Sequence, residues 1–311
     1  MKEVFQIIRD PRFQLLYGVR QRFSVGPEPR RVRLNREGCT LVEGVVKKSM
    51  VYPYMLLATH PSPVRGNVFA PIFGVVTEIN ERSIFLDAAE PGEDVRALAA
   101  GVEKQDLLSA PQRGAELAML LKTLGVNTRS LGQDCEKLII NGLNPDPGVT
   151  WAEPMLLTHQ ETLRAGLEML RRLSPAREIV LAAPKELRLR LNDVQVVHVA
   201  AHYPASIDAL VVKAVTGEEN PAGVGIVGLH NVWSLGRVVR TGYPLVETVL
   251  TIGSRDHSGN YIVREGSLLG DLLHFAHIDL KPGDTLVRGG PLRGESLDRL
   301  DRSVTRGTTG V

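Results

Sequence analysis

The stretch KLIINGLNPDPGVT, at residues 137–150, decides the fold class of this chain. Residues 138–140, Leu-Ile-Ile, form an apolar run without polar alternation, which is typical of a strand buried on both faces of a sheet. The run ends at Asn141 and Gly142, and the two prolines that follow disfavour helix, so we expect the next helix only after Thr158. A buried strand that leads into a polar loop indicates the carboxyl edge of an open α/β sheet, where such folds bind ligands. An ordinary connection between a strand and a helix explains the pattern equally well.

The composition indicates a globular protein. Its 311 residues suffice for two or three domains, and the net charge of +2 implies neither nucleic acid nor an anionic membrane as a partner. The two cysteines, Cys39 and Cys135, are far apart, which suits a reducing cytosol and excludes a cluster held by four thiolates of this chain. No apolar run approaches the ~20 residues of a membrane span, and the N-terminus lacks the apolar core of a signal peptide. We therefore expect no direct membrane span.

The N-terminal part of the chain predicts one short helix followed by strands. Val4, Ile7 and Ile8 favour an amphipathic helix that ends before Pro11. From residue 29 to about residue 87, short β-branched runs alternate with Gly, Pro and Asn turns. We expect strands throughout this second segment.

The middle of the chain predicts helices alternating with strands. Gly114 begins a helical pattern of leucines that ends at Gly125, a suitable C-cap. Thr158 and Glu161 have the spacing of a capping box, which predicts the start of a second helix. Strands are expected at residues 178–183 and 194–200, with a short helix, KELRLRL, between them at residues 185–191. This alternation favours a mostly parallel sheet.

Residues 244–294 predict a small module of two strands joined by an HSGN turn at residues 257–260, then a helix and a closing strand. His274 and His277 are expected on one face of that helix. This pair has no obvious third ligand. His198 and His202 are four residues apart but straddle the end of a predicted strand, where that spacing does not make a helical metal pair, so we expect no metal site.

The order of motifs resembles that of the C subunit of the Rnf electron-transport complex. Four segments carry the resemblance, and each is similar to a motif of that subunit: NGLNPDPGVTWAEPMLL (141–157), HYPASIDAL (202–210), GVGIVGLHNVWS (223–234) and GGPLRG (289–294). Relatives of that subunit are the A subunit of the sodium-translocating NADH:quinone reductase (Nqr) and the flavin-bearing NADH-dehydrogenase subunit of complex I. The resemblance covers residues 30–311, and the tail SVTRGTTGV is part of it.

The resemblance implies an α/β protein with three domains. After an N-terminal extension (1–28) it implies a barrel-sandwich, lipoyl-like β domain (29–90) and a Rossmann-like, flavoprotein-type α/β domain (91–243). A β-grasp domain of the soluble-ligand-binding type (SLBB-like), with the tail, completes the chain (244–311). The iron–sulfur domain that follows in the Rnf subunit is not expected, because the sequence stops at Val311.

The chain departs from this family where the family binds its nucleotides. The relatives hold the flavin phosphate and the dinucleotide with the backbone N–H groups of a glycine-rich loop. Here only Gly114 remains in that position, next to Arg113, and a single glycine cannot supply several such groups. Ser206 replaces a family glycine and Asp208 a glutamate. Trp233 also replaces a glycine, although packing at the start of a helix explains Trp233 without any ligand. The resemblance therefore implies a degenerate nucleotide site.

We expect any ligand site over the carboxyl ends of the sheet strands. One side is expected to hold Asn141, Gly142, Asn144 and Asp146, and the other Tyr203, Ser206, Asp208 and Asn231. Arg113 and Gly114 are the remaining candidates for a phosphate. We expect the isolated chain to retain neither FMN nor NADH. If the degenerate site still functions, FMN and NADH are the expected ligands.

The resemblance implies a subunit of a membrane-associated, Rnf- or Nqr-like NADH-linked electron-transport complex, in which the chain itself is not catalytic. Its role would be scaffolding or the binding of quinone or a partner, and its partners would be integral-membrane and redox subunits. It would lie in the cytoplasm, on the inner face of the cell membrane. One alternative is an active dehydrogenase subunit that binds FMN and NADH. A second is a stand-alone ligand-binding protein that uses its SLBB-like domain.

Overall fold

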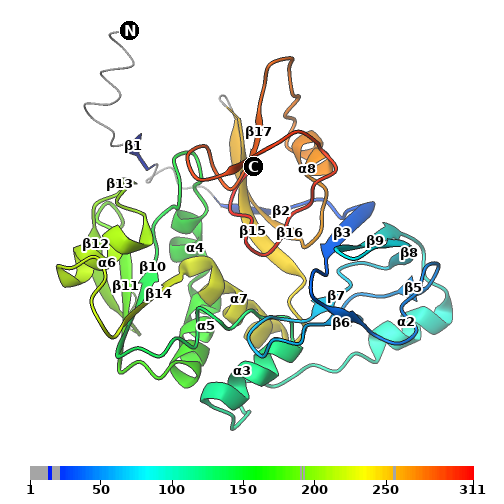
Figure 1. The fold of residues 1–311 in the computed structure, drawn as a ribbon, viewed down its shortest axis with the longest axis horizontal. Coiled ribbons are helices and arrows are strands. Elements are labelled where there is room, and N and C mark those ends of the chain that lie inside the picture. Colours follow the sequence, from blue (N-terminus) through cyan, green and yellow to red (C-terminus); the bar gives the residue numbers. More distant parts are fainter. Residues whose placement is uncertain (1–12, 16–21, 190, 192, 255–256) are drawn as a thin grey trace.

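The computed structural model describes residues 13–15, 22–189, 191, 193–254 and 257–311 (Figure 1). The helix expected at Val4, Ile7 and Ile8 lies outside the described residues. Three regions are named here by the expected boundaries: the N-terminal β region (29–90), the α/β region (91–243) and the C-terminal region (244–311). Figure 1 shows most of the α/β region on the left, the N-terminal β region at the lower right and the C-terminal region at the top; the first helix of the α/β region, at Glu93–Ala100, is drawn at the lower right beside the N-terminal β region. The division into domains at these boundaries stays a prediction.

The α/β region is built on a parallel sheet of four strands, which confirms the mostly parallel sheet expected from the sequence. The strand order is β12-β11-β10-β14, and Ile139 of β10 pairs with Val180 of β11 and Ile226 of β14. The strands are β10 (Lys137–Asn141), β11 (Glu178–Pro184), β12 (Gln195–Val199) and β14 (Val224–Gly228). The helices are α2 (Glu93–Ala100), α3 (Gly114–Thr123), α4 (Ala152–Thr158), α5 (Gln160–Leu173), α6 (Asp208–Thr216) and α7 (Leu229–Thr241).

Both faces of β10 are buried, because successive side chains of a strand point to opposite faces. Leu138 and Ile140 pack into a core shared with α3, α5 and α7, whereas Ile139 packs into a separate core with residues of α6. Helices α5 and α7 touch at two glycines. A Cβ on Gly236 would lie 1.8 Å from the carbonyl oxygen of Thr162, and one on Gly166 would lie 2.1 Å from that of Val232. The close crossing therefore depends on glycine at both positions.

The start of the helical segment after β10 was predicted wrongly. Helix α4 begins at Ala152, before the expected start after Thr158. Pro154 lies in the first turn of α4, where a missing N–H loses no hydrogen bond. Thr158 does not cap α5; its hydroxyl donates to the carbonyl oxygen of Pro154 at 2.6 Å, and His159 occupies the N-cap without a side-chain bond.

The helix expected at residues 185–191 is also wrong for the part of it that the structure describes. Residues 185–189 form a turn, in which the backbone N–H of Lys185 donates to Val199 of β12 at 3.1 Å. Leu187 and Leu191 are buried in the core of the α/β region. The spacing of these two leucines also suits a helix, so it is the backbone bond to the neighbouring strand that favours the turn.

The N-terminal β region consists of short antiparallel strands, as expected. Two sheets, ordered β3-β9-β8-β5 and β4-β6-β7, enclose a core that includes Val32, Leu57 and Leu86. The strands are β3 (Arg31–Asn35), β4 (Thr40–Leu41), β5 (Met50–Val51), β6 (Leu56–Thr59), β7 (Val68–Phe69), β8 (Gly74–Ile79) and β9 (Ser83–Ala88).

The loop between β6 and β7 joins the N-terminal β region to the α/β region. The N–H of Thr128 donates to the carbonyl of Val64 at 2.9 Å, and the N–H of Gly66 donates to the side chain of Asn127 at 2.9 Å. Arg306 of the C-terminal region joins the same place: it forms an ion pair with Glu265 at 2.8 Å and donates to the carbonyls of Gly125 and Asn67. One arginine thus contacts all three regions.

The C-terminal region contains the expected strands and helix, with different limits. Strand β15 (Glu247–Gly253) pairs with β16 (Ser258–Arg264), so most of the HSGN segment belongs to the second strand and not to a turn. Helix α8 (Leu269–Phe275) ends before His277, whose φ of 56° places it outside the helix, so His274 and His277 do not share a helix face. The hairpin of β17 (Leu286–Arg288) and β18 (Glu295–Leu297) follows.

The segment before residue 29 takes part in two sheets, which the sequence did not predict. Strand β2 (Phe23–Val25) adds to β16 in parallel, and β1 (Phe13–Gln14) pairs with β13 (His202–Tyr203) of the α/β region. Through these two strands, the expected N-terminal extension (1–28) contacts both the C-terminal and the α/β regions.

Candidate functional site

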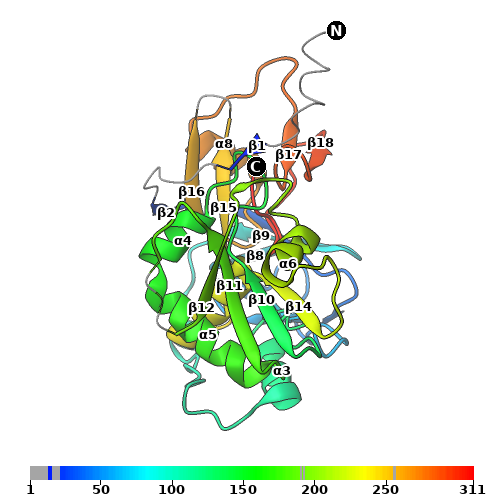
Figure 2. The same cartoon turned by 90° about the vertical axis from the view of Figure 1, so that its left-hand side faces the viewer.

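A cavity of about 650 Å³ lies between the carboxyl edge of the central sheet and the C-terminal region. One wall comes from the ends of β10 and β14, the loop after β10 and the starts of α6 and α7. The opposite wall comes from β17, β18 and the tail at residues 305–309. Figure 2 shows these C-terminal elements above the sheet that carries β10 and β14. The lining side chains are mostly polar.

Three of the predicted site residues meet in this cavity: Asn141, Asp208 and Asn231. The side-chain amide of Asn141 donates to the Asp208 carboxylate at 2.8 Å and to the carbonyl of Ser206 at 3.0 Å. Asn141 ends β10 and Asp208 starts α6, so the bond joins two elements that approach each other at the carboxyl edge. Asn231 lies in the first turn of α7, directly after β14.

Three other predicted residues hold the loop after β10 in place. Asn144 is fully buried and accepts a hydrogen bond from the N–H of Ala152 at 3.0 Å, at the start of α4. Asp146, also fully buried, accepts from the N–H groups of Leu292 and Arg293 at 3.0 and 3.1 Å. Burial raises the pKa of Asp146, and these two donors oppose the rise. Gly142 allows a close approach, because a Cβ there would lie 2.7 Å from the carbonyl oxygen of Ala182.

Tyr203 and Ser206 are not among the residues that line the cavity. Ser206 is 1% exposed, and its hydroxyl donates to the carbonyl of Pro145 at 3.4 Å. Tyr203 belongs to β13, whose backbone pairs with β1. These two residues support the loops next to the cavity.

Arg113 and Gly114 lie away from the cavity, so grouping them with the carboxyl-edge residues was wrong. They begin α3, which lies at the bottom of both Figure 1 and Figure 2, whereas β17 lies at the top. The loop just before them wraps around Arg172, whose guanidinium donates to the carbonyls of Leu107, Leu108, Ala110 and Gln112. Arg172 is in the last turn of α5, which returns the chain to the start of β11, so this loop is at the amino edge of the sheet.

The sequence reasoning missed Trp151, His230 and the whole wall from the C-terminal region. The rings of Trp151 and His230 meet edge to face, with centroids 6.0 Å apart. Burial lowers the pKa of His230 to about 4, against the opposing charge of Asp208, so this imidazole is neutral at pH 7. The position of His230 next to Asn231 was a usable signal, since both follow the end of a strand. The C-terminal wall had no local signal, because it lines the cavity only through long-range packing.

Trp233, in contrast, is a core residue. It is fully buried within α7 and does not line the cavity. Its packing agrees with the explanation that needs no ligand.

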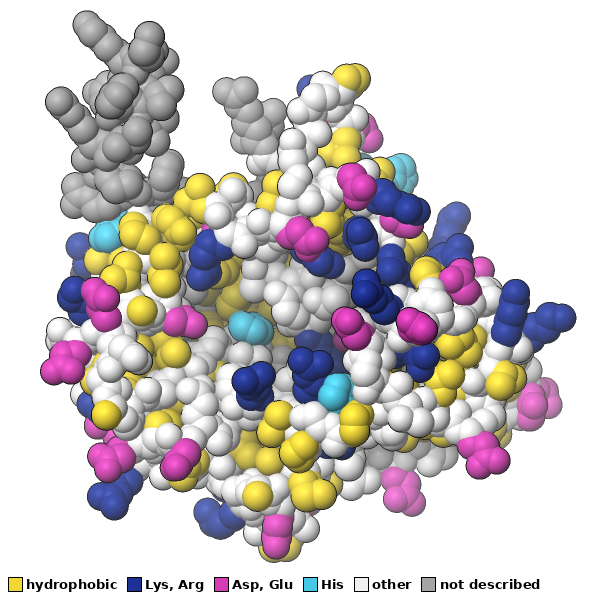
Figure 3. All heavy atoms as spheres, viewed as in Figure 1, with side chains coloured by type: hydrophobic (Ala, Val, Ile, Leu, Met, Phe, Trp, Pro, Cys, Tyr) yellow, Lys and Arg dark blue, Asp and Glu magenta, His cyan; other side chains and the backbone are white. Residues whose placement is uncertain are grey.

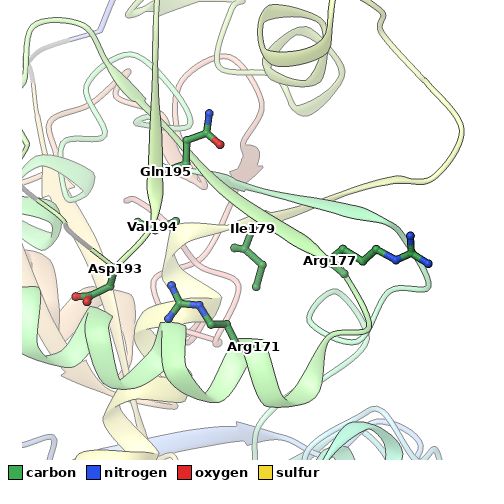
Figure 4. A pocket seen from close by; sticks show the side chains of 7 residues that line it. Arg171, Arg177, Ile179, Asp193, Val194 and Gln195 are labelled. Carbon is green, nitrogen blue, oxygen red and sulfur yellow. The ribbon is translucent and has the colours of Figure 1, made fainter.

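A second hollow, of about 520 Å³, lies at the amino edge between α5 and the starts of β11 and β12. Figure 4 shows that its two arginines diverge: Arg171 extends towards Asp193, whereas Arg177 extends away from the other labelled side chains. Because the charges do not converge on one point, this hollow makes a poor anion site.

The space-filling view shows no continuous patch of one charge on the facing surface, where basic and acidic side chains alternate (Figure 3).

The residues at the carboxyl edge do not fit the way in which the family is expected to hold a flavin phosphate. That mode needs several bare backbone N–H groups in succession. The segment before β10 contributes Ser130 to the cavity, and nearby Gly132 makes no close approach, because a Cβ there would lie 3.7 Å from its nearest neighbour. On the opposite wall, Gly290 brings protein loops together, because a Cβ there would lie 2.6 Å from the side chain of Asp146, and the two glycines that line the cavity, Gly289 and Gly307, are separate in sequence. The described lining of the cavity therefore does not supply the run of bare N–H groups that this mode of phosphate binding needs.

Comparison with known proteins agrees with the class suggested by fold and motifs. The chain has the mixed α/β fold of a chain in the crystal structure of NAD+-reducing [NiFe]-hydrogenase in the air-oxidized state. The TM-score is 0.50 at 15% identity, over 71% of this chain and 50% of that one, and at this identity the likeness shows the fold alone. No protein-family model matches the chain.

Curated relatives confirm the resemblance to the C subunit of the Rnf complex. The chain is 26% identical over 197 residues to the C subunit of the ion-translocating oxidoreductase complex of Haemophilus influenzae (strain PittEE), which covers 57% of this chain and 30% of that protein. It is 22% identical over 303 residues to the C subunit of the proton-translocating ferredoxin:NAD(+) oxidoreductase complex of Clostridium ljungdahlii, over 86% of this chain and 66% of that protein. The chain thus spans less than a third of the length of the Haemophilus relative.

Proposed function

We propose that this chain is a subunit of a membrane-associated, Rnf- or Nqr-like NADH-linked electron-transport complex and does not itself transfer hydride. Its role is to hold partner subunits or a quinone. The similarity to relatives named as the C subunits of ion-translocating complexes supports the assembly. The observation that carries the non-catalytic role is the separation of Arg113 and Gly114 from the carboxyl-edge cavity.

The physical argument concerns the flavin phosphate. A phosphate removed from water needs charge-assisted hydrogen bonds in return, each worth ~1.5–3 kcal/mol. Without the glycine-rich loop, the loss of two such bonds weakens binding by a factor on the order of a hundred to tens of thousands. A site weakened to this extent does not keep FMN through purification.

The proposed location is peripheral, on the inner face of the cell membrane, through contacts with integral-membrane and redox subunits. Within the part of the chain that the structure describes, no helix has both the length and the apolar character needed to span a bilayer. Membrane association in this proposal therefore comes from partners.

Two measurements test the proposal. The tagged chain, expressed in its own cells, is expected to co-purify with integral-membrane redox subunits from solubilised membranes. Calorimetric titration of the purified chain with FMN and with NADH is expected to give no sub-micromolar binding. Recovery of the chain without membrane subunits contradicts the assembly, and tight binding of either nucleotide contradicts the non-catalytic role.

One observation favours a second candidate, an active subunit that binds FMN and NADH. The cavity is large enough for a mononucleotide, and it brings Asn141, Asp208 and Asn231 together at the carboxyl edge. Under this alternative, sub-micromolar binding is weakened by Asp208→Asn.

A further inference from the structure

We infer that the hollow at the amino edge of the central sheet is a docking site for a segment of a partner subunit, in which an apolar side chain is flanked on both sides by acidic residues. The inference rests on the proposed function, because it assigns the face by which the chain holds a partner. Its support comes from the apolar floor of the hollow, from two arginines at its rim and from the ion pair of the carboxylate in its lining.

The floor of the hollow is apolar. Ala176, Ile179 and Val194 line it; Val194 is buried, and the other two are half-buried. Ile179 belongs to β11 and Val194 directly precedes β12, so the floor is built on the sheet. The volume of about 520 Å³ is large enough for an apolar side chain of a partner, and burial of that side chain removes apolar surface from water.

The rim carries two positive charges that no described residue neutralises. Arg171 lies in the last turn of α5 and Arg177 directly precedes β11, and both are exposed. Neither guanidinium has an ion pair or a hydrogen bond within the described part of the chain, whereas the adjacent Arg172 donates to four carbonyls. Carboxylates of a partner can therefore bind these two guanidinium groups.

The carboxylate in the lining already has a partner. Asp193 forms an ion pair at 3.1 Å with Arg164, which does not line the hollow. Arg171 extends towards Asp193 in Figure 4, but the two do not form an ion pair. Because the unpaired charges of the lining are positive, the hollow attracts an acidic segment and repels a basic one.

The direction of the two arginines favours a polypeptide over a single small anion. Figure 4 shows Arg171 and Arg177 diverging, with Ile179 drawn between them. A small anion meets one of these side chains, whereas a segment with an acidic residue on each side of an apolar one reaches both and covers the floor. The exposed amide of Gln195, at the start of β12, can form a hydrogen bond with the backbone of the same segment.

The first experiment identifies what lies against the hollow. The photo-crosslinker p-benzoylphenylalanine replaces Gln195 in the full chain, expressed in its own cells. We expect irradiation to link this position to a subunit that co-purifies with the chain. Mass spectrometry is expected to place the link in a segment with acidic residues on both sides of an apolar one. The same crosslinker at Thr285, exposed in the C-terminal region, is the control and should not link to that segment.

The charges are tested by co-purification from solubilised membranes. Arg171→Glu combined with Arg177→Glu is expected to lower recovery of the linked subunit about tenfold or more, because like charges then face each other. Arg171→Lys combined with Arg177→Lys keeps both charges and should retain most of the recovery. Charge reversal at Arg96 and Arg299 is the matched control, since both are exposed, pair with acidic neighbours and lie outside the hollow. Circular dichroism and thermal unfolding show whether every variant remains folded.

The outcomes separate this inference from the proposed function. Co-purification that survives the charge reversal at Arg171 and Arg177 overturns the inference and leaves the proposed function standing. A recovered complex without a link from position 195 has the same meaning, as has a link to a segment without acidic residues or to a second copy of this chain. Recovery of the unaltered chain without membrane subunits contradicts the proposed function. A link from position 195 to an acidic segment of a protein outside the membrane then supports the docking site alone.

Discussion

At the amino edge of the central sheet a single arginine, Arg172, donates hydrogen bonds to four carbonyls of the loop before α3, and the arginines around the hollow at that edge diverge. At the carboxyl edge, loops from two regions meet around a cavity of about 650 Å³, and much of their contact passes through the buried Asp146. Both edges belong to the same four-stranded sheet. Each edge has a hollow, but the charges at the amino edge do not converge, whereas polar side chains of several loops gather around the cavity at the carboxyl edge, which suits a binding site.

The largest effect is expected at the amino edge. Arg172→Ala removes the donor for four carbonyls at once, and we expect the free energy of unfolding to fall by about 3–4 kcal/mol. Chemical denaturation in urea measures it. The neighbouring Arg171 is exposed, so Arg171→Ala is the control and is expected to change stability by less than about 0.5 kcal/mol. Equal effects of the two substitutions would remove the basis for calling the amino edge structural.

The free energy of unfolding is expected to depend on pH through His230, at the carboxyl edge. His230 is neutral in the folded chain down to a pKa of about 4, whereas its ordinary pKa is 6.5. Below pH 6.5 the unfolded chain binds a proton that the folded chain does not, so stability falls as the pH drops towards 4, by up to about 3 kcal/mol.

Denaturation at a series of pH values tests this expectation, with His230→Gln as the comparison variant. The variant should show a flatter profile between pH 6.5 and 4. Burial also lowers the pKa of His159, so part of the slope is expected to remain. Burial raises the pKa of Asp146, which works in the opposite direction. A profile that His230→Gln leaves unchanged would contradict the burial of this imidazole.

A smaller loss of stability is expected when the contact of Asp146 with the loop at Leu292 and Arg293 is removed. Asp146→Ala leaves the N–H groups of Leu292 and Arg293 without an acceptor, and we expect a loss of about 2 kcal/mol. Hydrogen exchange should show faster exchange at these two amides. The exposed Asp279 provides the control, and Asp279→Ala is expected to change neither quantity. Unchanged exchange at Leu292 and Arg293 would show that the loop is held by other contacts.

The smallest effect is expected from Arg113, the residue that sequence reasoning favoured for a phosphate. Arg113 is exposed at the start of α3 and caps nothing with its side chain. Arg113→Ala should change the free energy of unfolding by less than about 0.5 kcal/mol and leave the calorimetric response to FMN the same as that of the unaltered chain. Weaker ligand binding in this variant would place the phosphate site at the amino edge and reverse the comparison.

The parallel sheet and several helices were predictable from the sequence, because their signals are local. The apolar run at residues 138–140 predicts a strand buried on both faces, and the leucines of α5 predict a helix with one buried face. The helix start at Ala152 was missed because the prolines were read only as helix breakers, although proline is tolerated in a first turn. The turn at residues 185–189 was missed because its hydrogen bond goes to a strand that is distant in sequence.

The sequence by itself determined which residues follow the ends of the strands, and three of them, Asn141, Asp208 and Asn231, line the cavity. This works because parallel strands bring their carboxyl ends to one edge whatever the loops do. Only the tertiary structure decided that Asp146 is a buried contact, that Arg113 lies at the other edge and that Arg288 lines the same cavity as the start of α7. Those outcomes depend on how the C-terminal region folds back over a loop about 150 residues away, and no local pattern encodes a contact at that separation.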